Sequence, residues 1–476
     1  MAFGGRKCPG DHVQRTFRVK VMATPAQKRR AWELIEDAGD VWAWVIDRQN
    51  AAFRGEREMD NNASALWDDQ RSHGPFGELS AHCTQDVVLS WQRSFFETAK
   101  RRKAGDLRAS YPMRKRRYVP VTWRKGEFEM RAGTVDEPGR RRRPAVELST
   151  RRGKGRLTLG LSHDHPYEPD KVRSVRLVPE GDELFVDITA RVAVTPAEQV
   201  PGRVAGADPG VIHPWAVTSG DRGLLVSGRG MRAEERLHLE DAEARDRVLA
   251  TKRKPVRAYP GKPRQEGSRR YKHLAAKRRK ADAKNRRRIA HANYTAANLV
   301  ARFVTENKVS LVRYGDPRGI TGKEAGAIHN RRVHRWPRAK QRDAVVHRLE
   351  EIAVKSDGCD EGGTSSTCPA CGARAIKSGR RLACANPECK KVHHRDLAGS
   401  QNIAQLGEDQ PMWAELTHVE HRRVGRPPRR DRRRQRWVQA RRAGVAAPGN
   451  ARTRASGPPS PAGGSPESSV TVSAVA

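Results

Sequence analysis

The sequence is poor in acidic and apolar residues and contains no long apolar segment. Its 55 aspartate and glutamate residues are outnumbered by 94 lysine and arginine residues, which gives a formal net charge of +39. Apolar residues make up 36% of the chain and aromatic residues 5%, and the mean hydropathy is −0.82. No segment approaches the roughly 18 apolar residues that span a bilayer, and the N-terminal sequence MAFGGRKCPG lacks the apolar core of a secretory signal. We therefore expect a cytoplasmic protein without a membrane partner.

The excess positive charge lies in short clusters, such as Arg140–Arg143 and Arg422–Arg436. Any one cluster is most simply a solvated face, but several clusters of one sign in a single chain favour a nucleic-acid partner. Such contacts release counterions, so binding should weaken as the salt concentration rises. The residues that we expect to contact phosphate are Arg114, Arg116, Arg117, Lys277, Arg278, Arg279, Arg286, Arg287, Arg288 and Arg395.

Cysteine is scarce, with 7 residues in the whole chain. Cys368 and Cys371 form a C-P-A-C pair, and Cys384 and Cys389 form a second, wider pair. Paired cysteines on short turns supply four soft donors to a tetrahedral zinc ion. We therefore predict a structural Zn²⁺ ribbon with these ligands. The remaining cysteines follow no pairing rule, which suits a reducing cytoplasm.

Two aspartates, far apart in the sequence, lie at the ends of elements that favour metal binding. The apolar segment Val204–Ala207 predicts a strand that ends at Asp208, with two further strands over 215–217 and 224–227. Asp396 begins the segment D-L-A-G-S-Q-N-I-A, whose apolar period predicts a helix. Such aspartates can meet over a sheet and hold Mg²⁺ against a phosphate, as in RNase H-like folds. Each is a weak signal alone, but their order around a basic helical insert and a cysteine ribbon is more specific.

With these motifs in this order, the chain resembles the TnpB and type V CRISPR effector family. The matching residues are the A-D-P-G of Asp208, the T-S-S-T-C-P-A-C-G of Cys368, the second cysteine pair and the H-R-D-L-A-G-S-Q-N-I-A of Asp396. The resemblance is dense over residues 204–406 and looser over 11–203. It implies a RuvC-like Mg²⁺-dependent endonuclease domain split by insertions, with guide RNA and target double-stranded DNA as partners.

The middle acidic motif departs from that family, in which an apolar strand ends in glutamate. Here the strand over 309–314 leads into Tyr314, Gly315 and Asp316. Tyr314 or Gly315 occupies the glutamate position, depending on the register, and Asp316 is left as the candidate third ligand. Neither Glu306 nor Glu324 is a convincing substitute.

The shorter, displaced side chain of Asp316 need not reach the metal, because catalytic geometry tolerates errors of only about 0.5 Å. We therefore predict a RuvC site of Asp208, Asp316 and Asp396 in which cleavage is weak or absent. The small type V-M effectors, once grouped as V-U, resemble this chain in that respect.

The pattern of helices and strands, read with the resemblance, predicts an α+β multidomain fold. A small wedge-like β-barrel over 11–23 and 118–200 is interrupted by a helical recognition domain over 24–117. A RuvC-like domain with the RNase H fold covers 201–357 and 390–406, with a helical insert over 232–306. A zinc ribbon covers 358–389, and a basic, largely disordered tail covers 407–476.

Individual residues refine the helical parts of this prediction. Thr24 followed by Pro25 predicts the start of the first helix. Trp42 and Trp91 recur with other apolar residues at helical spacing, so they should form a core and not a base-stacking surface. Tyr294 should lie on the buried face of a helix over 266–306 whose first half is basic.

Three functions stay open from the sequence. The first is an RNA-guided DNA-binding effector of the type V group. The second is a transposon-encoded TnpB endonuclease, which neighbouring transposase genes would distinguish from a CRISPR effector beside its array. The third, of another class, is a guide-free zinc-ribbon regulator that keeps the RuvC fold only as a scaffold, and co-purifying small RNA would exclude it. The sequence does not indicate an oligomeric state.

Overall fold

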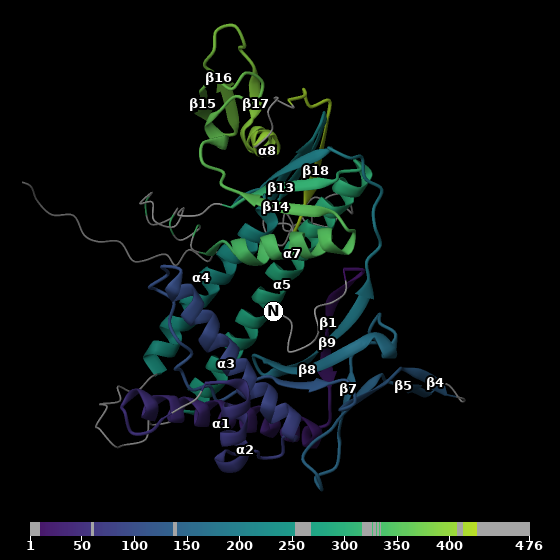
Figure 1. Ribbon diagram of the computed structural model, residues 1–476, viewed down its shortest axis with the longest axis vertical. Coiled ribbons are helices and arrows are strands. Elements are labelled where there is room, and N and C mark those ends of the chain that lie inside the picture. The colour runs from purple at the N-terminus through teal and green to yellow at the C-terminus, as the bar shows by residue number, and fades with distance from the viewer. Residues whose placement is uncertain are drawn as a thin grey trace, which may run out of the picture. The chain divides into compact units, whose positions relative to one another are not determined.

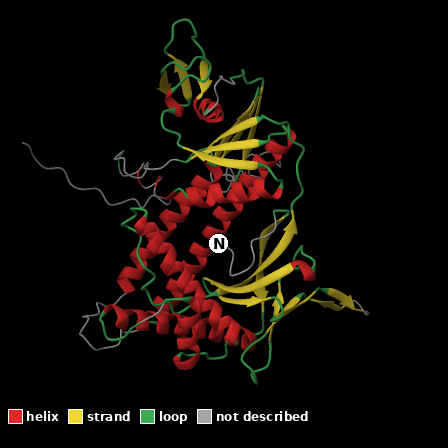
Figure 2. Cartoon of the chain, in the orientation of Figure 1, coloured by secondary structure: helices red, strands yellow, loops and turns green. Residues whose placement is uncertain are grey.

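The computed structural model describes residues 10–58, 61–136, 140–252, 268–316, 335–406 and 413–425, together with residues 326, 330 and 333. Its described residues form a seven-stranded, a six-stranded and a three-stranded sheet, and helices accompany the two larger ones (Figures 1 and 2). A separate hairpin pairs β4 (Thr134–Asp136) with β5 (Arg140–Arg142). The predicted α+β fold class is therefore confirmed.

The seven-stranded sheet has the order β2-β8-β9-β1-β7-β6-β3. Its long strand β1 (His12–Met22) pairs along most of its length with β9 (Glu183–Ala193), and its last two residues pair with β7 (Leu157–Leu161). Because one strand serves both halves, the sheet curls into a nearly closed barrel. The other strands are β2 (Val121–Arg124), β3 (Phe128–Arg131), β6 (Ala145–Leu148) and β8 (Val172–Glu180), with the short helix η1 (Pro169–Lys171) before β8.

Helices α1 (Pro25–Phe53), α2 (Ala63–His73) and α3 (Ala81–Lys103) lie between β1 and β2 in the sequence. Thr24 caps α1 as predicted: its side chain accepts a hydrogen bond from the backbone of Gln27, whose side chain accepts one from the Thr24 backbone. Trp42 and Trp91 are almost fully buried and share one core with the barrel strands. The prediction that these aromatics form core is confirmed.

The six-stranded sheet has the order β14-β13-β10-β11-β12-β18. Strand β10 (Val204–Asp208) pairs in parallel with β13 (Leu311–Gly315), which pairs in parallel with β14 (Lys355–Cys359). On its other side β10 pairs antiparallel with β11 (Trp215–Ser219), which turns into β12 (Arg222–Ser227). Strand β10 thus ends at Asp208 and is followed by two further strands, as the sequence predicts.

Strand β18 (His418–Arg423) lies within the segment 407–476, which the sequence predicts to be a largely disordered tail. It pairs in parallel with β12 along its whole length and so completes the sheet. Its sequence HVEHRR has no apolar alternation because an edge strand exposes much of its surface. The rest of the predicted tail, over 407–412 and 426–476, lies outside the described residues.

Helices α4 (Arg229–Lys252) and α5 (Arg269–Glu306) match the predicted insert, and α5 and α7 (Arg338–Glu351) pack against the six-stranded sheet. The C-terminal half of α5 is docked through Ala297 and Phe303, which are buried. The prediction for Tyr294 is wrong, because this side chain is 57% exposed. No helix among the described residues combines the length and apolar character needed to cross a membrane.

The ribbon follows β14 and consists of β15 (Ala375–Ser378), β16 (Arg381–Cys384) and β17 (Val392–His394), preceded by the short helix η3 (Thr364–Ser366). Since β17 pairs with β16, the ribbon extends beyond the predicted boundary at 389. Helix α8 (Arg395–Gln405) begins directly after β17 and packs on β10 and β11. The ribbon is thus connected without a linker to the helix that carries Asp396.

Candidate metal centres and nucleic-acid-binding residues

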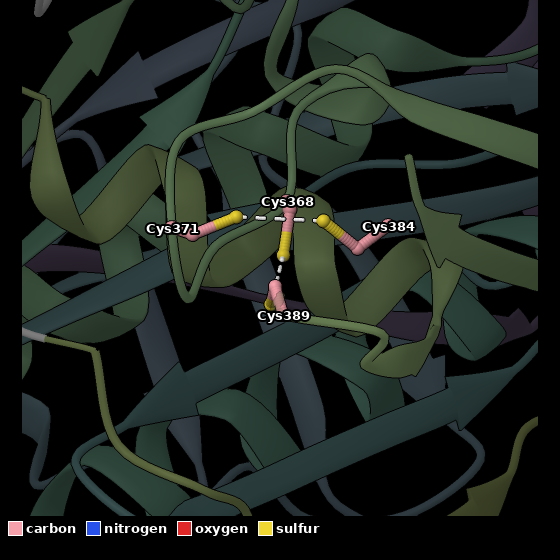
Figure 3. A group of neighbouring side chains, drawn as sticks. All are labelled: Cys368, Cys371, Cys384 and Cys389. Carbon is pink, nitrogen blue, oxygen red and sulfur yellow. Dashed lines mark hydrogen bonds between the residues drawn. The ribbon is translucent and has the colours of Figure 1, made fainter. Parts of the chain in front are cut away.

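Two knuckles of the ribbon bring the four predicted cysteines together (Figure 3). Their sulfur atoms all lie within 4.8 Å of one another, with 3.4 Å between Cys371 and Cys384 and 3.9 Å between Cys368 and Cys389. Four thiolates around zinc at about 2.3 Å stand roughly 3.8 Å apart, so this set fits tetrahedral coordination. Backbone amides support the fit, because the Ala373 N–H is the main reason why the pKa of Cys371 falls to about 7. These cysteines can therefore hold a metal ion.

Asp208 and Asp396 approach each other where β10 ends and α8 begins. The approach depends on glycines: a Cβ at Gly206 would lie 2.6 Å from the Ala404 nitrogen, and one at Gly399 would lie 2.7 Å from Oδ2 of Asp208. Without those methyl groups, α8 packs directly on β10 and the Asp208 carboxylate lies against the helix. The Asp208 carboxylate thus lies beside Gly399, in the helix whose first turn carries Asp396.

The electrostatic environment of the two aspartates differs. Burial, followed by the charges of Glu361 and Asp396, raises the pKa of Asp208 well above 3.8. Asp396 accepts hydrogen bonds through Oδ2 from His213 Nδ1 at 2.6 Å and from Arg380 at 2.5 Å. Although burial opposes the shift, these partners lower the pKa of Asp396. Arg380 ends the turn between β15 and β16, so the ribbon itself helps to orient Asp396.

The structure answers which residue stands at the glutamate position of β13. Alternate residues of a strand face opposite sides of a sheet. Arg313 reaches the α8 carbonyl of Ala404 at 2.9 Å, so Gly315 also faces α8, whereas Tyr314 packs against the opposite core. Position 315 is therefore the one beside Asp208, and glycine leaves it without a side chain. The backbone N–H of Asp316 donates to the Cys359 carbonyl at 2.9 Å.

Glu361, which the sequence did not suggest, fills that space. A Cβ at Gly315 would overlap Oε2 of Glu361 and lie 3.2 Å from the Glu361 Cβ. This oxygen is buried and has no hydrogen-bond partner. Burial, followed by the charges of Asp316 and Asp360, raises the pKa of Glu361 to about 7. The residue lies just past β14, a strand whose polar sequence KSDGC was not recognised.

The carboxylates form a looser group than the cysteines. Among the described residues, only the four cysteines bring three or more cysteine, histidine or carboxylate ligands close enough to hold an ion without rearrangement. The carboxylates nevertheless fit Mg²⁺ chemically, because hard oxygen donors are what it prefers and burial leaves Asp208 and Glu361 poorly compensated. Small side-chain movements would be needed to draw them onto one ion.

The predicted phosphate-binding residues before β2 are exposed. The Arg116 guanidinium lies 4.6 Å from the centre of the Trp42 ring, and Arg117 forms an ion pair with Glu36 at 3.2 Å. The backbone carbonyl of Arg114 accepts a hydrogen bond from Trp42 at 3.1 Å. Arg116 and Arg117 thus contact the helical block through their side chains and Arg114 through its backbone, while all three residues stay exposed.

On α5, several predicted phosphate contacts form internal ion pairs instead. Arg287 and Arg279 reach Glu180 and Asp182, around the turn between β8 and β9, at 3.2 Å and 3.0 Å. Arg278 pairs with Asp246 and Arg288 with Glu234, both on α4. Lys277 and Arg286 are exposed. Nε of Arg286 lies 4.0 Å from the Glu180 carboxylate, a longer contact than that of Arg287. Arg395 lies 3.6 Å from Asp396. The exposed members are therefore the better candidates for phosphate contact.

Comparison with known proteins gives one family match and a set of similar folds. The Cas12f1-like TNB domain family matches residues 340–403, which include the ribbon. A solved structure of a Cas12f1–sgRNA–target DNA complex is 14% identical, with a TM-score of 0.51 over 83% of this chain and 99% of that chain. The mini-RNA-guided endonuclease CRISPR-Cas_phi3 is 10% identical, with a TM-score of 0.47 over 85% of this chain and 94% of that chain. No curated protein matches the sequence. Residues 340–403 thus match the Cas12f1-like TNB family, and the described chain has a fold similar to that of the Cas12f1 structure.

Proposed function

We propose that the chain is an RNA-guided effector that binds a guide RNA and the double-stranded DNA target with which the guide pairs. The observation that carries this proposal is the meeting of Asp208 and Asp396 directly beside a ribbon of the Cas12f1-like TNB type. The net charge of +39 supports it, because two nucleic acids would supply the compensating negative charge. The similar solved Cas12f1 structure is itself a complex with a guide RNA and target DNA.

The chain's own residues suggest how the roles divide. Exposed basic residues such as Arg116 and Arg286 would contact phosphates without reading bases, while guide pairing reads the sequence. Asp208 and Asp396 would hold Mg²⁺, and His213 and Arg380 orient Asp396 by the hydrogen bonds described above. When bound, Mg²⁺ supplies an activated water and stabilises charge on the scissile phosphate.

The sequence also predicts that cleavage is weak or absent, because β13 ends without glutamate. That prediction concerns only the third carboxylate, so it is independent of guide and target binding. Cleavage should be weak or absent if Asp316 is the only carboxylate left to complete the site. Cleavage should not be weakened if another carboxylate takes the place of the missing glutamate.

The experiment that tests the proposal starts from the full chain expressed with its flanking genomic DNA as a source of guide RNA. Small RNA of defined sequence should co-purify, and its sequencing identifies the guide segment. A duplex matched to that segment should bind more tightly than a scrambled duplex at the same salt concentration. Absence of RNA, with equal affinity for both duplexes, would instead favour the guide-free regulator.

A further inference from the structure

The volume beside Asp208 at the end of β13 is occupied by a carboxylate from another strand. Gly315 faces α8 and has no side chain, and Oε2 of Glu361 lies where a side chain at 315 would begin. The side chain of Ile403 on α8 also borders this volume, because its Cδ1 lies 3.2 Å from the position of that Cβ. A carboxylate at this place is therefore available even though β13 itself does not supply one.

The backbone places Glu361 there in a defined way. Strand β14 pairs with β13 so that Cys359 is opposite Gly315, and Glu361 follows just beyond the end of the pairing. The Glu361 carbonyl accepts hydrogen bonds from the Thr364 N–H at 3.2 Å and the Thr364 hydroxyl at 2.8 Å. The next residues turn through Gly363, whose φ is 84°, into η3. Glu361 is thus held by a turn and not by a long loop.

One oxygen of the Glu361 carboxylate has no hydrogen-bond partner among the described residues. This oxygen, Oε2, is also buried, an arrangement that costs free energy unless a ligand compensates it. Its neighbours Asp316 and Asp360 carry the same charge and cannot stabilise it. The charges that act on Glu361 are all of its own sign, so a cation would compensate it.

We propose that Glu361 supplies the third metal-binding carboxylate of the acidic site, in place of the glutamate that Gly315 lacks. The proposal rests on the proposed function only in taking Asp208 and Asp396 as the other two ligands. A glutamate just after β14 thus replaces the glutamate that β13 would carry, and its carboxylate reaches the space beside Gly315. The weak-cleavage prediction is then reversed, because the site again has three carboxylates.

Asp316 is the competing third ligand, and the structure favours Glu361 over it. The negative charges that raise the pKa of Asp208 are those of Glu361 and Asp396, and the charge of Arg395 opposes them. Asp316 acts instead on Glu361 and on Arg342 of α7. Its backbone is tied to Cys359 by the hydrogen bond that continues the pairing with β14. Glu361, in contrast, has its Oε2 in the space beside Gly315, which makes it the better candidate.

Direct metal binding tests the proposal without relying on cleavage. Mn²⁺, a substitute for Mg²⁺ that is visible by electron paramagnetic resonance, would be titrated at pH 8 into the zinc-replete full chain. Glu361→Gln keeps the shape of the side chain but removes the charge, and should weaken Mn²⁺ binding at least about tenfold. Asp360→Asn is the matched control, since it removes the neighbouring exposed carboxylate and keeps an acceptor for the Gly362 N–H; its affinity should stay close to that of the wild type.

A second test moves the carboxylate from position 361 to position 315. In the double variant Gly315→Glu/Glu361→Ala, the removal of Glu361 clears the space and the carboxylate returns to β13, so Mn²⁺ affinity should recover. The proposal is overturned if Glu361→Gln binds Mn²⁺ like Asp360→Asn, if only Asp316→Asn reduces the affinity, or if the wild type binds no Mn²⁺. Guide RNA is measured in the same preparations, so failure of the RNA-guided function would appear separately from failure of the metal site.

Discussion

The contact between β10 and α8 is the element that sets the distance between Asp208 and Asp396, and Gly206→Ala is a direct test of it. The added Cβ would lie 2.6 Å from the Ala404 nitrogen, and closer still to the Ser400 carbonyl oxygen. Ordinary van der Waals contact begins at 3.4 Å, so the shortfall at Ala404 alone is about 0.8 Å. Both contacting atoms belong to the helix backbone, which cannot rotate away as a side chain can.

The substitution should therefore displace α8 or strain β10. Overpacking of a buried contact typically costs about 1–3 kcal/mol, and metal sites tolerate displacements of only about 0.5 Å. We expect Gly206→Ala to lower the unfolding temperature by at least about 2 °C and to weaken Mn²⁺ binding at the acidic site. Gly10→Ala is the control, because a Cβ there meets nothing within 4 Å.

Thermal unfolding followed by circular dichroism, together with Mn²⁺ titration, provides the two readouts. If Gly206→Ala unfolds at the same temperature as Gly10→Ala and binds Mn²⁺ equally well, α8 does not pack on β10 as described. The positions assigned to Asp208 and Asp396 would then be incorrect.

Three further predictions concern the ribbon, the basic helix and the acidic site. Cys384→Ser should release zinc and lower the unfolding temperature, whereas the control Cys359→Ser should retain zinc. Elemental analysis measures the zinc content of both variants. Wild-type protein without zinc would contradict the ribbon assignment. Arg286→Glu should weaken RNA binding and reduce its salt dependence. Arg287→Gln, which breaks the ion pair with Glu180, should chiefly lower the stability of the fold. If both variants weaken RNA binding equally, Arg286 is not a phosphate contact distinct from the internal ion pair of Arg287. Because the pKa of Glu361 is raised from 4.5 to about 7, the metal-free folded chain holds that proton more tightly than the unfolded chain, so its stability should fall as the pH rises through about 7. In Glu361→Gln, denaturant titrations should show this fall diminished, and an unchanged pH profile would contradict the assignment.

Features that depend on local chemistry could be predicted from the sequence. The cysteine pairs have the spacing that zinc requires, and Asp208 follows an apolar strand whose burial is required by the sheet. Thr24 and Pro25 marked the start of α1 because capping needs only neighbouring residues. Trp42 and Trp91 were recognisable as core residues because large aromatic side chains at helical spacing lie on one face of a helix, where burial removes them from water.

Within the six-stranded sheet, the two strands that the sequence did not reveal are β14 and β18, which are its two edges. Edge strands are polar and half solvated, so KSDGC and HVEHRR lack the apolar alternation by which strands are recognised. Glu361 was missed for that reason, since its position beside Gly315 follows only from the pairing of β14 with β13. Tyr294 was misplaced because helical periodicity gives the phase of a face only approximately over a helix as long as α5.

The internal ion pairs of α5 show a second limit. A basic cluster has the same sequence whether it contacts phosphate or a carboxylate of its own chain. Arg287 and Arg288 pair with Glu180 and Glu234, residues that are distant in the sequence. Only the fold separates these from exposed members such as Lys277.

The most direct test of the central claim is the affinity of the purified ribonucleoprotein for a labelled DNA duplex matched to its co-purified RNA. An RNA-guided effector should bind the matched duplex at least about tenfold more tightly than a scrambled duplex, and treatment with ribonuclease should abolish the difference. Equal affinity for the two duplexes, unchanged by ribonuclease, would contradict RNA-guided recognition.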